Sequence, residues 1–279
     1  MSPIQSARSK VLRLTAVMLL ATAPLGVVRA QGIEQQALEQ QGLTEQVTPG
    51  TWSVTLGGGL ADAPRYPGAS TNRVRFVPLA SAAYDDRVSL GPLGLGVAVL
   101  RWNGFRAGPV LGFQGGRQES DDPRLAGLGD ISSSVTAGAF AGYGFGPLSV
   151  STTVRQAISH GTNGLSGLFQ INFRHRIAGT RTFLMLGPDF EFGNGDFERT
   201  WFGITPQQSA MSPYGLSVYT PRAGIDSVGL HAALTHVLSA HFLVRAFASF
   251  KELTGDAAAS PIVERRDQFL IGAGIAYHF

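Results

Sequence analysis

Three side chains that could act together in catalysis lie in the polar stretch "SHGTNG", residues 159–164. His160 offers a general base, Thr162 a hydroxyl and Asn163 an amide. A hydroxyl nucleophile needs a base in contact with it, a group that orients the base and a pocket for the oxyanion. The hydroxyl here belongs to a β-branched threonine, which is less accessible than serine, and the two glycines favour a polar turn. We therefore expect a loop here and keep lipid acyl hydrolysis only as an alternative.

No other arrangement of reactive side chains predicts an enzyme. The chain has no cysteine, which excludes disulfides and thiolate metal sites. Its six histidines are scattered, and His231 and His236 would point to opposite faces of a strand. No phosphate-binding loop, nucleophile elbow or dinucleotide fingerprint is present. We expect a protein without catalytic residues, bound metal or cofactor.

The amino terminus has the layout of a secretory signal peptide. Arg8, Lys10 and Arg13 precede the apolar run "LTAVMLLATAPLGV", and small residues precede Gln31. The run is too short to span a bilayer as a helix, so we predict a signal peptide over residues 1–30 that is cleaved on export. Of the 22 Lys and Arg, 18 remain after cleavage against 19 Asp and Glu. The high pI of the full chain therefore comes from the leader. The mature chain is nearly neutral, so its charge does not indicate nucleic-acid binding.

Residues 31–50 are polar and rich in glutamine, without alternation, and they end at Pro49-Gly50. We predict a flexible or marginally helical tail in the periplasm. The last eleven residues, "FLIGAGIAYHF", behave differently, because apolar residues recur at every second position from Phe269 to Phe279, with aromatic residues at both ends. Side chains of a strand point alternately to its two faces, and about ten residues carry a tilted strand across a bilayer. This pattern predicts a membrane-spanning strand.

The alternation recurs along residues 51–279, with turn residues between the segments, in a chain with 36 glycines. It predicts an all-β fold: a transmembrane antiparallel β-barrel of about 12 strands, or about 10 if "RVSLGPLGLG" is one irregular excursion. Short connectors such as "FGP" alternate with long ones such as residues 193–222, although "GPLG" is short where a long one is expected. An even strand count with this parity predicts that both termini are periplasmic.

The strand register also assigns charged residues to the lumen. The predicted inward-facing charges, interspersed with glycines, are Arg106, Arg155, Arg174, Asp189, Glu191 and Arg245. Such a face can line a water-filled pore or form a closed network of ion pairs. For a narrow barrel we favour the filled, structural interior over a general pore.

Several segments, in order, resemble the MipA/OmpV family of Gram-negative outer-membrane proteins, named after an MltA-interacting protein. They include "WSVTLGGGLADAPRYPGAS", "RFVPLASAAYDD", "TWFGITPQQSAMSPYGLSVYTPRAGI" and "FKELTGDAAASPIVERRDQFLIGAGIAYHF", and the likeness runs from about Trp52 to Phe279. The resemblance implies an outer-membrane barrel that binds lipid. It also implies a scaffold in which a lytic transglycosylase, a murein hydrolase, meets a penicillin-binding murein synthase. Porin-like or adhesive roles are the alternative, since members are also discussed in those terms.

The motif residues that carry the resemblance are Tyr66, Pro67, Gly68, Trp201, Phe202, Gly203, Ser260 and Pro261. Tyr66-Pro67-Gly68 suits a tight turn, because proline presets φ and glycine allows a positive φ. Trp201 and Phe202, like Trp52 and Trp102, could be aromatics of an interfacial girdle. The chain closes with Tyr277 and Phe279 on one face of the last strand, and we expect this end to be the signal for the barrel-assembly machinery.

Overall fold

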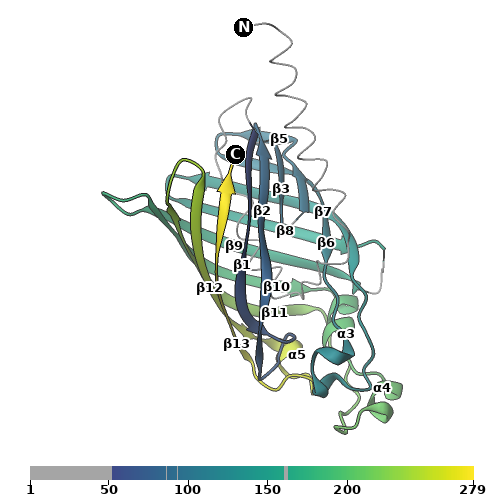
Figure 1. Cartoon of the computed structure of the whole chain (residues 1–279). Coiled ribbons are helices and arrows are strands. Elements are labelled where there is room, and N and C mark those ends of the chain that lie inside the picture. The colour runs from purple at the N-terminus through teal and green to yellow at the C-terminus, as the bar shows by residue number, and fades with distance from the viewer. Residues whose placement is uncertain (1–51, 86, 93, 160–162) are drawn as a thin grey trace, which may run out of the picture.

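The computed structural model describes residues 52–279, apart from residues 86, 93 and 160–162. The predicted signal peptide, the predicted tail over residues 31–50, His160 and Thr162 lie outside the described residues. Thirteen strands form one antiparallel sheet (Figure 1). Their bounds are β1 Trp52–Pro64, β2 Asn72–Tyr84, β3 Val88–Gly91, β4 Gly94–Val97, β5 Leu100–Trp102, β6 Phe105–Gln114, β7 Ser134–Phe145, β8 Leu148–Ala157, β9 Leu165–Arg176, β10 Thr182–Gly193, β11 Gly224–Val237, β12 Phe242–Leu253 and β13 Asp267–His278.

The sheet closes on itself as a barrel. β1 pairs with β13, and β4 and β5 are two pieces of one wall strand, because both pair with β6. Counting β4 and β5 together gives twelve strands around the barrel, so the prediction of a twelve-strand antiparallel barrel is confirmed. Closure leaves no long unpaired edge, which a barrel wall in lipid requires.

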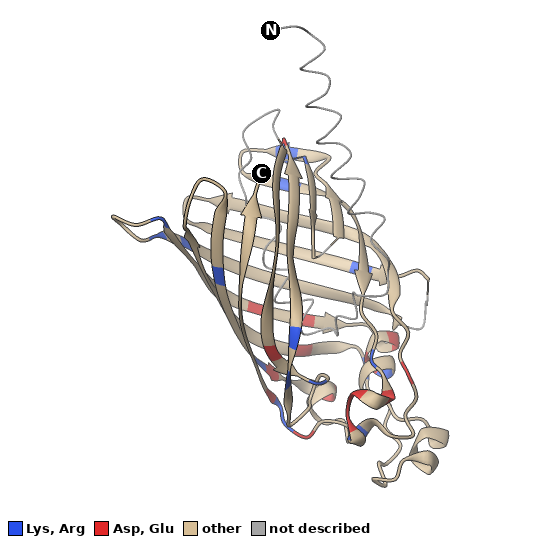
Figure 2. Ribbon diagram, in the orientation of Figure 1, with Lys and Arg blue, Asp and Glu red and all other residues tan. Residues whose placement is uncertain are grey.

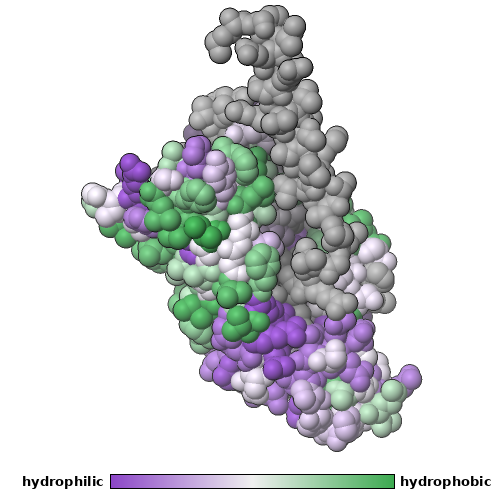
Figure 3. All heavy atoms as spheres, in the orientation of Figure 1, coloured by the Kyte–Doolittle hydropathy of each residue, from purple (hydrophilic) through white to green (hydrophobic). Residues whose placement is uncertain are grey.

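Alternating burial along the strands separates an outer face from the lumen. On β13, Phe269, Ile271 and Ile275 are exposed, whereas Gln268 and Leu270 are buried. Figure 3 shows apolar residues gathered on the barrel wall and hydrophilic ones towards the end that carries α3 and α4. The outward apolar rows are the part of the surface that lipid can cover.

The two ends of the barrel differ in their connectors. Tight connections between β2 and β3, β5 and β6, β7 and β8, β9 and β10, and β11 and β12 lie at one end, here called the turn end. β1 begins there, and the Phe279 main-chain nitrogen donates to the Val54 oxygen at 2.9 Å, so the carboxyl terminus lies at the same end. The longer connections lie at the opposite end, here called the loop end. That both termini face the periplasm stays a prediction.

The helices belong to the loop end (Figure 1). They are the 3₁₀ turns η1 Glu119–Asp121 and η2 Pro123–Leu125, and the helices α3 Gly195–Phe202, α4 Pro206–Met211 and α5 Gly255–Ala258. Asn194 caps α3 by accepting from the Phe197 nitrogen at 2.9 Å, and Thr205 with Gln208 forms a capping box on α4. Across the described part of the chain, no helix has both the length and the apolar character needed to cross a membrane.

Inside the barrel, apolar side chains accompany the charged ones. Val77, Leu79, Met185, Phe247 and Leu270 form a buried cluster in the lumen beneath β1, β2 and β10–β13. Gly272 leaves room for the Phe247 ring, whose Cζ would lie 2.4 Å from a Cβ at that position. The lumen is therefore packed by large apolar residues as well as by the predicted glycines and charges.

Candidate functional site

Four loops meet at the loop end and form one structure, here called the loop cap: residues 65–71, 115–133, 194–223 and 254–266. At its centre lies Tyr66, whose side chain is fully buried. Its hydroxyl donates to the Ile262 main-chain oxygen at 3.1 Å. Burial, reinforced by the charge of Glu264, raises the pKa of Tyr66 above its ordinary value, so the hydroxyl stays protonated as a donor.

The predicted turn at Tyr66-Pro67-Gly68 is confirmed. The Ala69 nitrogen donates to the Tyr66 oxygen at 3.0 Å, and Gly68 has a φ of 96°. The Gly68 oxygen accepts from the Glu264 nitrogen at 2.8 Å, and its own nitrogen donates to Gln268 Oε1 at 3.1 Å. A Cβ at Gly68 would lie 2.6 Å from Val263 Cγ2. This motif thus joins the first loop to the last one.

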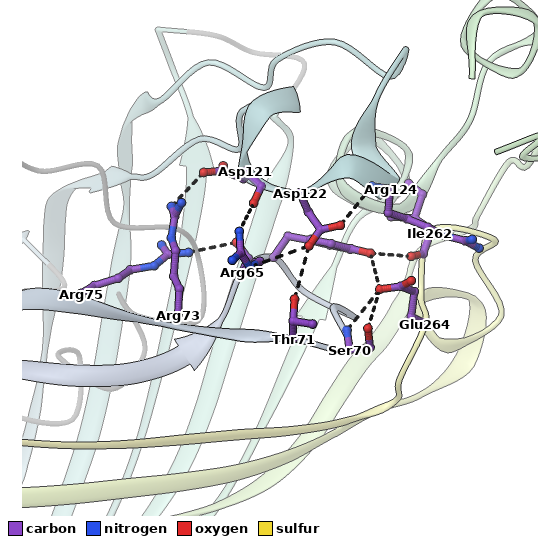
Figure 4. Close-up of polar contacts among 11 residues, drawn as sticks. Arg65, Ser70, Thr71, Arg73, Arg75, Asp121, Asp122, Arg124, Ile262 and Glu264 are labelled. Carbon is purple, nitrogen blue, oxygen red and sulfur yellow. Dashed lines mark hydrogen bonds and ion pairs between the residues drawn. The ribbon is translucent and has the colours of Figure 1, made fainter. Parts of the chain in front are cut away.

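Ion pairs join the first loop and β2 to the loop over residues 115–133 (Figure 4). Arg73 Nη2 donates to Asp121 Oδ1 at 2.8 Å, and Arg65 Nη1 donates to the Asp121 main-chain oxygen at 3.2 Å. Thr71 Oγ1 approaches Asp122 Oδ2 at 3.4 Å. Figure 2 shows charges of both signs gathered at this end, consistent with a surface held together by such pairs.

Trp201 and Phe202 are not girdle aromatics, and that prediction is wrong. Both are buried in the loop cap, with 3% exposure each, and they pack with Leu253 and Ala257. The girdle alternative assumed that they ended a strand, whereas they end α3, whose apolar face turns into the cap. Trp52 and Trp102, by contrast, are exposed at the turn end.

The remaining motif residues also bind other parts of the cap. The Gly203 nitrogen ends α3 by donating to the Arg199 oxygen at 3.1 Å. Ser260 Oγ donates to the Phe202 oxygen, and the Pro261 oxygen accepts from Arg124 Nη2 at 2.7 Å. Most of these motif residues therefore join one loop to another.

Arg117 was not singled out from the sequence, yet it links two halves of the cap. Its side chain is buried, and its Nη1 donates to the Trp201 main-chain oxygen at 2.9 Å. Burial lowers the pKa of Arg117 to about 10, and the charges of Asp121 and Asp130 partly offset this. Nothing in the local pattern of "GGRQES" distinguishes Arg117 from an exposed loop arginine.

The loop cap reaches across the mouth of the barrel. The loop after β6 contacts the loop after β10, although four strand positions separate them in the wall. A buried cluster of apolar side chains fills the space between the loops: Tyr66, Ala69, Leu125, Leu128, Ile204, Leu216 and Ile262. A path through the loop end would have to displace this core.

A layer of paired polar residues lies inside the barrel below the cap. His231 Nδ1 lies 3.3 Å from Asp189 Oδ2, and its Nε2 lies 2.8 Å from Asn172 Oδ1. Lys251 Nζ donates to Glu191. Gly229 makes this possible, since a Cβ there would lie 2.6 Å from Asp189 Oδ1. Asp189 and Glu191 thus lie in the lumen as their register implied, but Lys251 and His231, which the sequence reasoning did not choose, are their partners.

Lys251 could have been predicted from the sequence as a charge in the lumen, since it shares the inward row of β12 with Arg245, six residues earlier.

The arginines that were predicted to face the lumen lie outside this polar layer. Arg106 and Arg174 line a cavity of about 590 Å³, and Arg174 and Arg245 line a second one of about 260 Å³. We call these two cavities together the arginine vestibule. Arg155 lies apart from both, on β8 near the loop end.

Of the three residues considered for acyl hydrolysis, Asn163 lies within the described part of the chain. Asn163 is buried, and its Nδ2 donates to the Ser132 oxygen at 2.8 Å, which holds two loops together. Among residues 52–279 as described, no group of three or more His, Asp or Glu side chains is arranged to hold a metal ion.

The last strand ends in a cluster of aromatic rings. Tyr277 stacks on His241 with 5.2 Å between ring centroids and meets Phe279 edge-on at 4.7 Å. At the same end, Trp52 lies 5.0 Å from Tyr84. Exposed aromatics at one level of the wall fit an interface between lipid and water.

Comparison with solved structures gives distant outer-membrane barrels. The high-pH structure of Pseudomonas putida OprB has 12% identity over 72% of this chain and 49% of that chain, with a TM-score of 0.39. This chain thus spans about half the length of OprB. The COG4313 outer membrane channel from Pseudomonas putida F1 has 10% identity over 84% of this chain and 97% of that chain, with a TM-score of 0.40. Such distant likenesses say nothing about transport by this chain.

No curated protein matches the chain at a significant level. A family model described as MltA-interacting protein MipA, however, matches residues 56–279. The matched residues run from within β1 to the last residue and include the whole loop cap. The chain therefore belongs to the MipA family of outer-membrane β-barrels.

Proposed function

We propose that this protein is a non-enzymatic scaffold that holds peptidoglycan-remodelling enzymes at the turn end of the barrel. The partners would be a lytic transglycosylase, as the family's description suggests, and a penicillin-binding murein synthase. The observation that carries the proposal is the apolar core of the loop cap, which fills the loop end. A barrel filled at one end is poorly suited to passive transport, which favours a role in binding.

The turn end offers the surface for such partners. If both termini are periplasmic, this end faces the murein layer. The hairpin between β9 and β10 extends from the barrel there (Figure 1), with Arg176 and Arg181 exposed. A basic, protruding hairpin can steer an acidic partner surface towards the membrane.

Site-specific cross-linking tests this proposal, because a chain without cysteine accepts single thiols cleanly. Ala178→Cys and Ala240→Cys place a thiol on exposed turns of the turn end, and Ala210→Cys is the matched control on exposed α4. With a thiol-reactive cross-linker in whole envelopes, the first two variants should capture a lytic transglycosylase and the control should not. Capture from neither turn variant, or equal capture from the control, would count against the scaffold.

The barrel wall implies two further partners. Lipid covers the outward apolar rows, and the barrel-assembly machinery would recognise β13 with Tyr277 and Phe279. We also propose that the protein carries no acyl-hydrolase activity, because Asn163 is engaged in joining loops. Hydrolysis of phospholipid or lipid A by the purified protein, abolished by His160→Ala, would contradict this.

An adhesive role is the second candidate, and one feature favours it. The loop between β10 and β11 exposes three large apolar side chains, Met211, Tyr214 and Val218, away from the buried core of the cap. Exposed apolar residues on a rigid loop can bind a surface. Replacing all three by serine should leave the scaffold function intact but abolish any adhesion of cells that express the protein.

A further inference from the structure

The hairpin between β9 and β10 extends beyond the neighbouring strand on one of its two sides (Figure 1). On the side of β8, the last bond of the wall is the one that the Arg174 nitrogen donates to the Pro147 oxygen, at 2.7 Å. β9 continues through Arg176, still paired with β10. On the other side, β11 accompanies β10 to its first residue, and the Val237 nitrogen donates to the Arg181 oxygen at 3.0 Å. One side of the hairpin is therefore paired throughout, and the tip of the other side is not.

The antiparallel geometry determines which main-chain groups lie on that second side. The N–H and C=O of one residue point to the same neighbouring strand, and those of the next residue point to the other. The Arg174 main chain points towards β8, so the Arg176 main chain, two residues further on, points the same way. The Ile177 nitrogen instead donates to the Thr182 oxygen at 2.9 Å, within the hairpin. Among the strands that the structure describes, none lies opposite the main chain of Arg176 on the β8 side. Such a short edge can accept a further strand.

The side chains along this edge are basic on one face and aromatic on the other. Arg176 belongs to the lumen-facing row of β9, and its guanidinium carbon lies 5.9 Å from the centroid of the Phe183 ring. On the opposite face, Phe173 and His175 stack with 6.2 Å between their ring centroids. Residues 165–188 contain three arginines and neither aspartate nor glutamate. The charge of this hairpin therefore favours an acidic occupant.

We propose that this edge binds an extended acidic segment of a partner protein, which adds to β9 as an antiparallel strand beyond the end of β8. The inference rests on the scaffold role proposed above and gives that role a binding mode. The residue directly opposite Arg176 exchanges main-chain bonds with it and places its side chain on the same face. An acidic residue there pairs with the Arg176 guanidinium. Its two neighbours in the segment lie on the face of Phe173 and His175, which favours apolar side chains. The segment thus alternates acidic and apolar residues.

Two N-methylated isomers of one peptide test the main-chain bonds. A fluorescent ten-residue peptide that alternates glutamate and valine is methylated either on every glutamate nitrogen or on every valine nitrogen. In the proposed register the glutamate N–H groups point to β9 and the valine N–H groups point away. The glutamate-methylated isomer should bind the full chain in detergent roughly tenfold more weakly, measured by fluorescence anisotropy, because its bonds to the edge are lost. Equal binding would overturn the proposal and leave only a basic surface, such as one that attracts lipid headgroups.

The position of the site is tested on the protein. Arg176→Glu should weaken binding of the valine-methylated isomer by roughly tenfold, because an attractive pair across the two strands becomes a repulsive one. The matched control is Arg199→Glu, which reverses an exposed arginine on α3 at the loop end and should bind the peptide like the parent. Heat-modifiable migration confirms that both variants form the barrel. An unchanged affinity in Arg176→Glu, or an equal loss in the control, would overturn the proposal.

The edge and the scaffold role can fail separately. Arg176→Glu, added to Ala178→Cys, should reduce the capture of a lytic transglycosylase in envelopes. Undiminished capture would keep the scaffold and overturn this edge as its binding site. If the peptides bind as expected and the turn variants capture no such enzyme, the edge is supported as a site for acidic segments and the scaffold role is rejected.

Discussion

The buried guanidinium of Arg117 donates a hydrogen bond of 2.9 Å to the main-chain oxygen of Trp201, 84 residues further along the chain. One residue follows β6 and the other ends α3 after β10, so this bond crosses the mouth of the barrel. It shows how the loop end is closed: by polar bonds between loops around a small apolar core.

Removing Arg117 should open the loop cap without unfolding the barrel. Arg117→Ala would remove a buried hydrogen bond from a charged group, with a cost to cap stability of about 2 kcal/mol. Limited proteolysis of the loop over residues 194–223 should become faster while heat-modifiable migration of the barrel is kept. Arg199→Ala, which removes an exposed pair with Asp196, is the control and should cleave like the parent.

Gly68 should tolerate no side chain. Gly68→Ala combines a φ of 96° with a Cβ 2.6 Å from Val263 Cγ2, so a loss of about 2 kcal/mol in cap stability is expected. Gly129 also has a positive φ, 73°, but a Cβ there meets nothing within 4 Å. Gly129→Ala should therefore cost less than Gly68→Ala. Similar losses in the two variants, measured by the same proteolysis, would show that the contact with Val263 is unimportant.

The cap should loosen as the pH rises through neutrality. Burial, with a smaller effect of Asp256, raises the pKa of Glu198 on α3 from 4.5 to about 7. An acid whose folded pKa is raised stabilises the fold fully below its unfolded pKa, and this stability is lost as the pH rises towards the folded one. Acrylamide quenching of Trp201, in a background of Trp52→Phe and Trp102→Phe, should increase between about pH 5 and pH 8.

The control for this effect is Glu198→Gln, which keeps the shape of the side chain and cannot ionise. Quenching of Trp201 in that variant should be independent of pH over the same interval. A pH dependence that persists in Glu198→Gln would assign the effect to another group.

Removing one member of the ion pair between Lys251 and Glu191 should destabilise the barrel more than removing both charges. Lys251→Met leaves the Glu191 carboxylate in the lumen without the amino group that binds it, at a cost of about 3–5 kcal/mol. Combining Lys251→Met with Glu191→Gln should recover much of the loss. Urea unfolding in lipid vesicles measures both. If the loss of stability in the double variant equalled the sum of the losses in the two single variants, the two side chains would not act as a pair.

The last residue should affect assembly more than stability. Phe279 donates from its main chain to Val54 while its ring is exposed, so Phe279→Ala leaves the wall intact. If β13 is the signal for the assembly machinery, the variant should accumulate unfolded in the periplasm, yet refold in detergent like the parent. Phe145→Ala, an exposed aromatic at the same end, serves as the control and should assemble normally.

Much of the wall could be predicted from local pattern alone. Period-two alternation marked the strands from β1 to β13, and even the short β3 and β4 followed from the residues around Gly91-Pro92. It also placed Asp189, Glu191 and Arg245 on inward rows, because side-chain direction in a strand depends only on parity. The turn at Gly68 followed from the residue types that allow a positive φ.

The loop cap and the pairings inside the lumen were decided by tertiary structure. Trp201 has the residue type of a girdle aromatic, and only its packing against Leu253 and Ala257 places it in a core. The register of β10, β11 and β12 places Lys251 beside Glu191. Period-two alternation in the sequence shows only which residues of one strand share a face. These contacts join residues from 52 positions apart, as for Trp201 and Leu253, to 196 apart, as for Tyr66 and Ile262, and they depend on how the closed barrel brings its loops together.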